Sequence, residues 1–345
     1  MAEARWLERV WFGDDALARS TRRALLPLEA VYRAIVGVRE ALYDTGVIEA
    51  QEPALPTLSV GNVSVGGTGK TPVAAWVARG LAERGARPAI VLRGYGEDEP
   101  LVHRALNPDI PVIVSADRVA GVERASNEGA TIAVLDDAFQ HRRIARDADL
   151  VLVSADRWMP ERRVLPAGPW REPLRAIRRA TLVLVTRKAA SEADADAVNA
   201  ALADVAPRIP RSTLHLVPSE LVEVGGSATR PFATVSGRSI RVLAAIGDPH
   251  AFVRQLEAAG ARVSAEIYPD HHQFHDDEIA RFAKSIPSDG LGICTLKDAV
   301  KLDGRWPREA PTLWYVSQHV IVERGVGGVE RILDDLARAR DRSPR

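Results

Sequence analysis

The feature that most constrains the fold is a glycine-rich segment between an apolar run and a helical pattern. The apolar run TLSVGN (57–62) is followed by the loop SVGGTGKT (64–71) and then by TPVAAWVARGLAERG (71–85). A strand, a glycine loop, a lysine, a threonine and a helix in this order are typical of a phosphate-binding loop, or P-loop. Ser64 replaces the first glycine of the strict G-x-x-x-x-G-K-[ST] pattern, and the rest of the pattern is intact.

Each position of this loop has an expected role in binding a nucleoside triphosphate. Backbone N–H groups at a helix N-terminus would surround the β-phosphate; they belong to Gly66, Gly67, Thr68 and Gly69. Lys70 would reach the β- and γ-phosphates, and the Thr71 hydroxyl would hold Mg²⁺. The alternative is a glycine-rich turn with an incidental lysine, but strand, loop, lysine, threonine and helix all favour phosphate binding.

Short β-rich runs alternate with helical patterns along the rest of the chain. The runs are RPAIVLRG (87–94), PVIVS (111–115), TIAVLDD (131–137), DLVLVSA (149–155) and ATLVLVTRK (180–188). This alternation predicts an α/β fold with a mostly parallel, doubly wound sheet of the P-loop NTPase type. A chain of 345 residues is long for one hydrophobic core, so we expect a second, smaller α/β domain.

The second unit begins near Ser236 with a strand, a helix and another strand. Asp248 is expected to cap that helix, with Pro249 in its first turn and Gly260 at its end. The segment LHLVPSELVEVGG (214–226) fits strands of either domain or a ribbon that links them. The patterns divide the chain into three regions: an N-terminal helical region (1–50), a P-loop domain (51–215) and a second α/β domain (225–335).

The segment ALLPLEAVYRAIVGVREALY (24–43) predicts an amphipathic N-terminal helix. Its apolar residues at helical spacing are Leu25, Leu28, Tyr32, Ile35 and Leu42, and Arg19, Arg22 and Arg23 precede them. The pattern fits a helix that lies on an anionic membrane surface, and it also fits a helix packed on its own protein. No apolar run reaches 18 residues, so we do not expect a conventional membrane span. Acidic residues interrupt the N-terminus and leave no apolar core of signal-peptide length, so we do not expect a secretory signal.

The charge and cysteine content exclude several kinds of partner. Lys+Arg and Asp+Glu number 46 each, so no global basic field indicates a nucleic-acid partner. The single cysteine, Cys294, excludes an intramolecular disulfide and a cysteine-based zinc cluster, and it fits a reducing compartment. The sequence shows no evident obligate protein partner.

Two acidic segments follow predicted strands. Asp136 and Asp137 end one strand at the sheet edge beside the P-loop, where the Mg²⁺ of a nucleotide needs a ligand. They point in opposite directions if the strand continues, so we expect one of them to contact the metal directly; a helix cap or turn is the alternative. Asp98 and Glu99 in RGYGEDEP (93–100) fit a base, metal partners or a solvated turn.

A histidine cluster lies in YPDHHQFHDDE (268–278), where His271, His272 and His275 follow Asp270. Three histidines raise the possibility of zinc, but no HExxH or HxH-plus-carboxylate pattern supports it. A histidine paired with a carboxylate as a proton acceptor fits an ATP-dependent transferase better.

The segment LPAGPWREP (165–173) is too rich in proline and glycine for regular structure. It fits a fixed loop that carries Arg171 and Glu172 toward a site, and it also fits a simple rigid connection. The segment alone does not distinguish these two interpretations.

The motifs are more informative together than singly. In chain order they are GNVSVGGTGKTP, RGYG, DEP, SADRVAG, LDDAFQHRRIARD, LPAGPWREP, IGDPHAF, YPDHHQF and TLKDAVK. From about Leu25 to about Val322 the chain resembles the tetraacyldisaccharide 4'-kinase family of lipid A biosynthesis. The resemblance implies transfer of the γ-phosphoryl group of ATP, with Mg²⁺, to the 4'-hydroxyl of a tetraacyldisaccharide 1-phosphate, which gives lipid IVA. It also implies an active site in the cleft between two domains and an N-terminal helix seated on the cytoplasmic face of the bacterial inner membrane.

The resemblance further implies roles for individual residues. Asp98 matches the catalytic carboxylate of the family, and His271 matches its histidine partner. Lys70 and Thr71 match the phosphate and Mg²⁺ groups, and Asp136 and Asp137 match the acidic pair at the strand end. Other site residues lie in the RGYG, DEP, QH and REP motifs: Arg93, Glu99, Gln140, His141, Arg171 and Glu172.

Three features depart from the family pattern. The segment between RGYG and DEP is shorter than usual, so a shifted loop would leave Asp98 out of reach of the acceptor hydroxyl. Ala138 stands where the family has a glycine, which is a mild steric change. Charged residues interrupt the N-terminal helix and predict a shallow membrane attachment: Glu29, Arg33, Arg39 and Glu40.

Two other functional classes are compatible with a P-loop. A nucleotide-switch GTPase, such as a metal-insertion chaperone, would use the histidine cluster to deliver a metal. A guanine-reading N-K-x-D would favour that class, but the nearest segments, VTRKAA and TLKDAV, lack the asparagine. The remaining class is a binding module that hydrolyses ATP to regulate a membrane partner.

Overall fold

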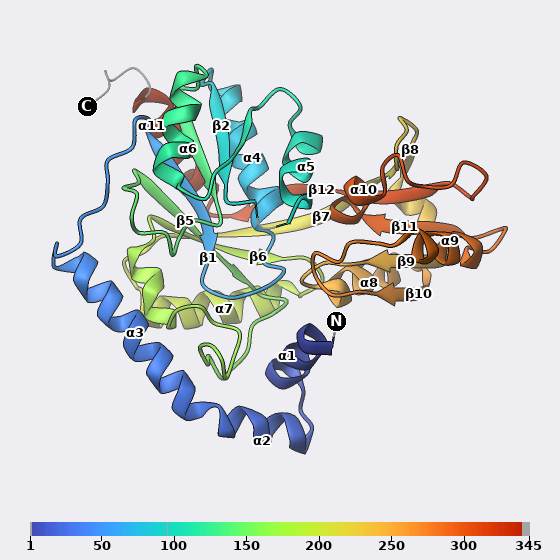
Figure 1. The fold of residues 1–345 in the computed structure, drawn as a ribbon, viewed down its shortest axis with the longest axis horizontal. Helices are drawn as coiled ribbons and strands as arrows, with labels where there is room; N and C mark the ends of the chain where they lie inside the picture. The colour runs from blue at the N-terminus through green and yellow to red at the C-terminus, as the bar shows by residue number, and fades with distance from the viewer. Residues whose placement is uncertain (1, 95, 340–345) are drawn as a thin grey trace.

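The computed structural model describes residues 2–94 and 96–339. Within them, one 12-stranded sheet has the order β10-β9-β11-β12-β7-β6-β5-β1-β4-β2-β3, with β8 (Thr229–Pro231) paired to β7. Figure 1 shows the sheet as two halves, each covered by helices, that meet along β7 and β12. The predicted α/β fold with a mainly parallel sheet is confirmed.

The first half of the sheet is entirely parallel. Its strands are β1 (Thr57–Asn62), β2 (Pro88–Leu92), β3 (Val112–Val114), β4 (Ile132–Asp136), β5 (Ala148–Ser154), β6 (Leu182–Arg187) and β7 (Arg211–Glu223). Its helices are α4 (Lys70–Glu83), α5 (Asp98–Leu106), α6 (Arg118–Asn127), α7 (Glu192–Val205) and α11 (Val326–Ala339), with the short 3₁₀ helix η1 (Leu174–Arg179).

Side-chain alternation explains why helices cover both faces of this half. Successive strand residues point to opposite faces. Leu150 and Leu152 of β5 pack with α4 and α11, whereas Val151 and Val153 of the same strand pack with α7. Because both sets are apolar, neither face of the sheet can be left to water.

The second half repeats this arrangement on a smaller scale. Its parallel strands are β9 (Ser239–Ala244), β10 (Arg262–Ile267), β11 (Leu291–Thr295) and β12 (Leu313–Arg324), and its helices are α8 (Pro249–Ala258), α9 (Asp276–Ser285), α10 (Leu296–Leu302) and the short η2 (Phe232–Val235). As predicted, Asp248 caps α8, accepting a hydrogen bond from Ala251 N at 3.1 Å, and Pro249 lies in the first turn. Gly260 follows the helix with a left-handed backbone at φ 87°.

β7 and β12 form the antiparallel ribbon that joins the two halves. The segment 214–226, which the sequence left between two interpretations, lies largely in β7. The first residues of this segment pair with β6 of the first half, and β12 pairs with the segment from Leu214 to Glu223. It is therefore both a strand of the first half and part of the link.

The N-terminal segment forms three helices, α1 (Ala2–Phe12), α2 (Ala16–Ala24) and α3 (Leu26–Asp44), which Figure 1 shows along the outside of the molecule. The single helix expected over 24–43 is thus wrong at its start. Pro27 has no N–H to continue α2, so the chain turns at Leu25 and a new helix begins.

The apolar face of α3 also differs from the expected series. Its exposed apolar residues, 57–63% accessible, are Leu28, Val31, Ile35 and Val38. Tyr32 instead faces the protein, where its hydroxyl donates to Arg171 O at 2.9 Å. Arg39 donates to Gln140 O at 2.6 Å, and Glu40 pairs with Arg179 at 2.7 Å. The polar side of α3 therefore packs on the protein, and the apolar side faces outward. Among the described residues, no helix has the length and apolar character needed to cross a membrane.

Candidate active site

The two halves of the sheet direct their carboxyl ends toward each other. β6 pairs with the start of β7 at Arg211–His215, and β11 pairs with the start of β12 at Leu313–Val316. Because β7 and β12 are antiparallel, the strands of the two halves run toward one another along the ribbon. Ligands of parallel α/β sheets bind beyond the carboxyl ends of the strands. A cavity of about 1000 Å³ lies between the segments that follow these ends.

This cavity brings together nearly all the residues that the sequence predicted for a site. Those that line it are Gly66, Gly67, Thr68, Gly69, Lys70, Thr71, Arg93, Glu99, Asp136, Asp137, Gln140, His141, Arg171, Glu172 and His271. Asp98 is fully buried and contacts the cavity through His271. Because the lining comes from both halves, a ligand in the cavity would contact both.

The predicted P-loop connects β1 to α4. Gly66 and Gly69 have left-handed backbones, at φ 90° and 85°, which glycine adopts without strain. Asn62 Nδ2 donates to Thr68 Oγ1 at 2.9 Å and fixes the loop against the end of β1. α4 begins at Lys70, so the first N–H groups of the helix are directed at the cavity. The loop can therefore bind an anion.

The two acids at the end of β4 have different surroundings. Asp136 is the last strand residue and is buried, with Oδ2 2.8 Å from His103 Nε2. Asp137 lies outside the strand with φ 53°, so the alternation expected for a continuing strand does not apply to this pair. Arg171 Nη1 donates to Asp137 at 2.8 Å, and Lys70 Nζ lies 3.7 Å from it. Burial raises the pKa of Asp137, but Lys70 and Arg171 outweigh it and bring this pKa below its ordinary value.

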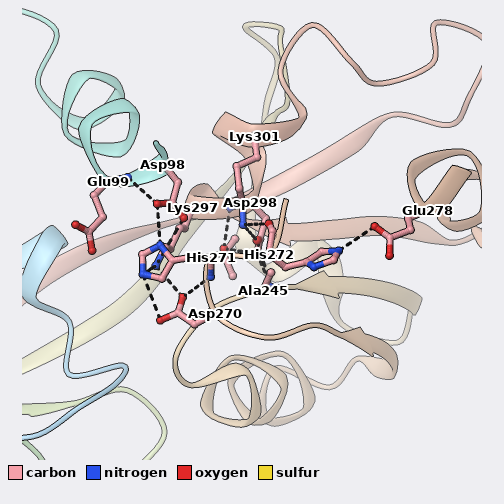
Figure 2. Close-up of polar contacts among 11 residues, drawn as sticks. Asp98, Glu99, Ala245, Asp270, His271, His272, Glu278, Lys297, Asp298 and Lys301 are labelled. Carbon is pink, nitrogen blue, oxygen red and sulfur yellow. Dashed lines mark hydrogen bonds and ion pairs between the residues drawn. The ribbon is translucent and has the colours of Figure 1, made fainter. Parts of the chain in front are cut away.

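Asp98 and His271 form a hydrogen-bonded pair across the cavity, as Figure 2 shows. Asp98 begins α5 rather than lying in a solvated turn, and its Oδ1 is 3.0 Å from His271 Nδ1. The short RGYG–DEP segment has therefore not separated Asp98 from His271. A Cβ at Gly96 would lie 2.6 Å from His271 Nδ1 and 2.7 Å from Asp98 Oδ1, so only glycine fits beside the pair.

The pKa values of the pair reflect this contact. The hydrogen bond that His271 donates to Asp98 raises the pKa of His271, although burial and Lys297 oppose the rise. Burial raises the pKa of Asp98, but His271 and Lys297 outweigh it and lower this pKa. Nearby, burial and the charge of Asp136 raise the pKa of Glu99 to about 7. Groups with shifted pKa values thus gather at one end of the cavity.

The other two histidines of the cluster point elsewhere. His272 Nε2 lies 2.9 Å from Glu278 Oε2, and His275 is the N-cap residue of α9. No group of three or more His, Cys, Asp or Glu side chains that could hold a metal occurs in the described part of the chain. The histidine cluster therefore does not form a zinc site there.

The 165–173 loop carries Arg171 and Glu172 to the cavity rather than serving only as a connection. Glu172 is 2% exposed and pairs with Arg179 at 2.7 Å. Burial raises the pKa of Glu172 despite this partner. Gln140 Nε2 donates to Asn62 O at 2.7 Å, so Gln140 lies next to the P-loop strand. His141 also lines the cavity, and burial lowers its pKa.

Several cavity residues were not singled out from the sequence. Lys188, after β6, donates to Gly67 O at 2.8 Å, and burial lowers its pKa. Arg118 at the start of α6 and Lys297 of α10 also line the cavity. Lys297 lies in the motif TLKDAVK and Arg118 in the motif SADRVAG. Both motifs carried the family resemblance, so they could have indicated these two residues.

The donor set fits Mg²⁺. Asp136 Oδ1 is buried and has no hydrogen-bond partner within the described residues. Thr71 and Asp137 supply further oxygens on the same cavity wall. Mg²⁺ in nucleotide sites is held by one or two carboxylates together with substrate phosphates rather than by a cage of side chains. A Mg²⁺ site of this kind does not need three protein ligands, so the lack of a three-residue cluster among the described residues does not argue against Mg²⁺ binding.

The comparison with known proteins identifies the family. The family model described as Tetraacyldisaccharide-1-P 4'-kinase matches residues 21–337. The chain belongs to this family. The tetraacyldisaccharide 4'-kinase of Halorhodospira halophila is 37% identical over 326 residues, which cover 89% of this chain and 90% of that protein. The enzyme of the same name from Anaeromyxobacter dehalogenans (strain 2CP-C) is 36% identical over 328 residues, 86% of each chain.

A solved structure agrees with this assignment. It is described as the "apo" form of LpxK from Aquifex aeolicus in complex with ATP, and it matches with a TM-score of 0.70 at 27% identity. The match covers 93% of this chain and 99% of that one. The 4'-kinase family predicted from the motifs is confirmed, and the nucleotide-switch GTPase is not favoured.

Proposed function

We propose that this member of the 4'-kinase family transfers the γ-phosphoryl group of ATP to the 4'-hydroxyl of a tetraacyldisaccharide 1-phosphate, giving lipid IVA in lipid A biosynthesis. The observation that carries the proposal is the convergence of the P-loop and the Asp98–His271 pair on one cavity. One side of that cavity has the features of a triphosphate site, and the other side holds a proton acceptor. Both are needed to phosphorylate an alcohol.

The P-loop residues would hold and polarise the triphosphate. Phosphoryl transfer spreads negative charge over the γ-phosphate oxygens, and fixed cations and N–H groups stabilise that charge. Lys70 lies at the helix N-terminus, and the amides of Gly66–Gly69 precede it. Arg171 is held next to Lys70 by their shared partner Asp137. These cations would contact the transferred group.

Mg²⁺ is the expected cofactor, and Thr71, Asp136 and Asp137 would hold it. Bound Mg²⁺ would neutralise phosphate charge, as it does in other P-loop enzymes. Asp136 is the better candidate for direct contact because its Oδ1 has no hydrogen-bond partner in the described residues. Asp137 is already held by Arg171 and Lys70.

The Asp98–His271 pair would accept the proton that the sugar hydroxyl loses as it attacks. General-base catalysis of this kind contributes about 10²–10⁴-fold. The remaining cavity residues would orient the disaccharide: Arg93, Glu99, Gln140, His141, Arg171 and Glu172. Because Asp98 and His271 belong to different halves, the base is assembled only when the halves are close together.

We propose that α3 seats the enzyme on the cytoplasmic face of the inner membrane, where its lipid substrate lies. Leu28, Val31, Ile35 and Val38 form one exposed apolar face, and the opposite side of the helix contacts the protein. An apolar helix face of this kind can bury itself at the lipid interface. Tyr32 and Arg39 of the same helix line the cavity, which would place the acceptor site next to the membrane.

We also propose a division of the chain into three regions. Residues 1–50 would form the membrane-associating region, 51–215 the P-loop domain and 225–335 the domain that closes over the cleft. The β7–β12 ribbon is the element along which such closure would occur.

A direct assay tests the proposed function. The purified protein is incubated with ³²P-γ-ATP or GTP, Mg²⁺ and a lipid A precursor in detergent. Label transferred from ATP to the lipid is expected. Nucleotide hydrolysis without labelled lipid would contradict the proposal and would instead favour a regulatory ATPase or GTPase.

A further inference from the structure

Lys297 is a cation that contacts both members of the Asp98–His271 pair, and the sequence motifs did not indicate a role for it. Its Nζ lies 3.3 Å from His271 Nε2 and 3.8 Å from Asp98 Oδ2, and it donates to Asp270 Oδ1 at 2.8 Å. Figure 2 shows these contacts converging on one lysine.

The position of Lys297 is fixed by the start of α10. Thr295 caps this helix, with its Oγ1 accepting from Asp298 N at 3.2 Å. Asp298 is fully buried and accepts from Ala245 N, after β9, at 3.2 Å. Lys301 pairs with Asp298 at 2.9 Å and donates to His272 O at 3.2 Å. The helix that carries Lys297 is thus tied to the loop that carries His271.

The hydrogen-bonding chemistry of lysine determines the form of the histidine. Burial lowers the pKa of Lys297, but Asp270 and Asp98 outweigh it and raise this pKa, so Lys297 is an ammonium. An ammonium has donors and no acceptor, so His271 Nε2 can only accept from it. The ring proton then lies on Nδ1, where it is donated to Asp98 Oδ1.

On the basis of the proposed kinase function, we propose that Lys297 is a positioning residue that keeps His271 neutral and Asp98 ionised before the reaction. The acceptor hydroxyl would then replace Lys297 as the donor to His271 Nε2, and its proton would pass to this nitrogen. Asp98 by itself favours a protonated histidine, because its carboxylate accepts the hydrogen bond of the ring. Lys297 opposes this effect by placing a positive charge at the other ring nitrogen.

The other charged groups around the ring define what loss of Lys297 would do. Asp98 on α5 and Asp270 in the loop itself act on His271 directly, and Glu99 on α5 also interacts with it. Lys301 on α10 acts on Asp98, and Lys70 on α4 acts on Glu99. Asp270 Oδ2 lies 3.8 Å from His271 Nε2 and is neutralised by Lys297. Removal of Lys297 would therefore delete a cation and expose an anion at the same nitrogen. Both changes favour the protonated pair.

The experiment compares Lys297→Met with Lys297→Arg in full-length protein, measuring kcat and KM for ATP from pH 5.5 to 9 with a lipid A precursor in mixed micelles. We expect the acidic limb of the kcat profile to move to higher pH by about 1 unit or more in Lys297→Met. Lys297→Arg keeps the charge and is expected to keep the limb near its wild-type position. Lys284→Met, an exposed lysine on α9, is the matched control and should leave the limb unmoved.

A second variant should move the acidic limb of the kcat profile in the opposite direction. Asp270→Asn removes the anion near His271 and leaves Lys297 in place, so the acidic limb should move to lower pH. This variant also keeps the proposal testable if Lys297→Met does not fold, which thermal melting would reveal.

Three results are decisive. If the wild type is active and the acidic limb of the kcat profile does not move in Lys297→Met or Asp270→Asn, the proposed role of Lys297 is wrong and the kinase function stands. A rise in KM for ATP without a shift of the limb would make Lys297 a phosphate ligand and would also overturn the proposal. No labelled lipid from the wild type would mean that the kinase function itself is wrong.

Discussion

Asp98 Oδ1 and His271 Nδ1 lie 3.0 Å apart although 173 positions separate the two residues in the chain. Asp98 begins α5 in the first half of the sheet, and His271 follows β10 in the second half. The contact forms because the carboxyl ends of both halves face one cavity. Chemistry that depends on this pair therefore depends on the relative position of the two halves.

Replacement of His271 by alanine tests the proposed base. We expect His271→Ala to lower kcat by about 10²–10⁴-fold, the usual contribution of general-base catalysis. ATP affinity should change little, because Lys70 and the P-loop amides remain. The measurement is steady-state transfer of label to the lipid together with nucleotide binding by fluorescence. Activity within a few-fold of wild type would exclude His271 from the base.

A Gly96→Ala substitution tests whether the geometry of the pair matters. The added Cβ would lie under 3 Å from both His271 Nδ1 and Asp98 Oδ1, so it must push them apart. Misplacement of a reacting group by about 1 Å can cost about 10²-fold, and we expect a loss of kcat of that order. Gly129→Ala is the matched control, because Gly129 also has a left-handed backbone but has no neighbour within 4 Å of the added atom. Equal kinetic effects in the two variants would mean that backbone strain, and not the pair, is responsible.

The raised pKa of Glu99 predicts how the free energy of unfolding depends on pH. Burial and Asp136 raise its pKa from 4.5 to about 7 in the folded protein. Between these two values the unfolded chain has lost this proton and the folded chain retains it, so stability falls as pH rises. The contribution of Glu99 to the free energy of unfolding is greatest below pH 4.5 and is lost as the pH rises through about 7.

Glu99→Gln removes this titration. In urea denaturation without nucleotide or metal, the free energy of unfolding of Glu99→Gln minus that of the wild type should grow from pH 5 to pH 8. A difference that stays constant over this range would show that Glu99 titrates near its ordinary pKa.

The exposed face of α3 tests the membrane proposal. The double variant Ile35→Glu, Val38→Glu should weaken binding to vesicles that contain anionic phospholipid by about tenfold or more, since burial of each side chain contributes about 1.5–3 kcal/mol. Stability should be nearly unchanged, because both side chains are already exposed. Ile321→Glu, at an exposed apolar position on β12, is the control and should bind vesicles like the wild type. Undiminished sedimentation of the double variant with vesicles would contradict the role of α3.

Local features of the sequence predicted the local structure well. The strand, glycine loop and helix around Lys70 were expected because adjacent residues determine such a turn, and the Asp248 cap of α8 was expected for the same reason. The helix at Asp98 was missed because a glycine-rich segment precedes it and its acids fit a turn equally well. The break at Leu25 was also missed, although Pro27 signals it.

What the sequence by itself determined is the set of chemical groups: a P-loop with Lys70, an acidic pair at a strand end and a histidine next to an acid. The family resemblance paired Asp98 with His271, and only the tertiary structure decided which other groups join them. Lys297 reaches His271 because β10 and β11 both neighbour β9. Both residues reach Asp98 because the antiparallel β7–β12 ribbon turns the second half to face the first. Strand order and the direction of that ribbon are set by packing between residues far apart in the chain, so no local pattern encodes them.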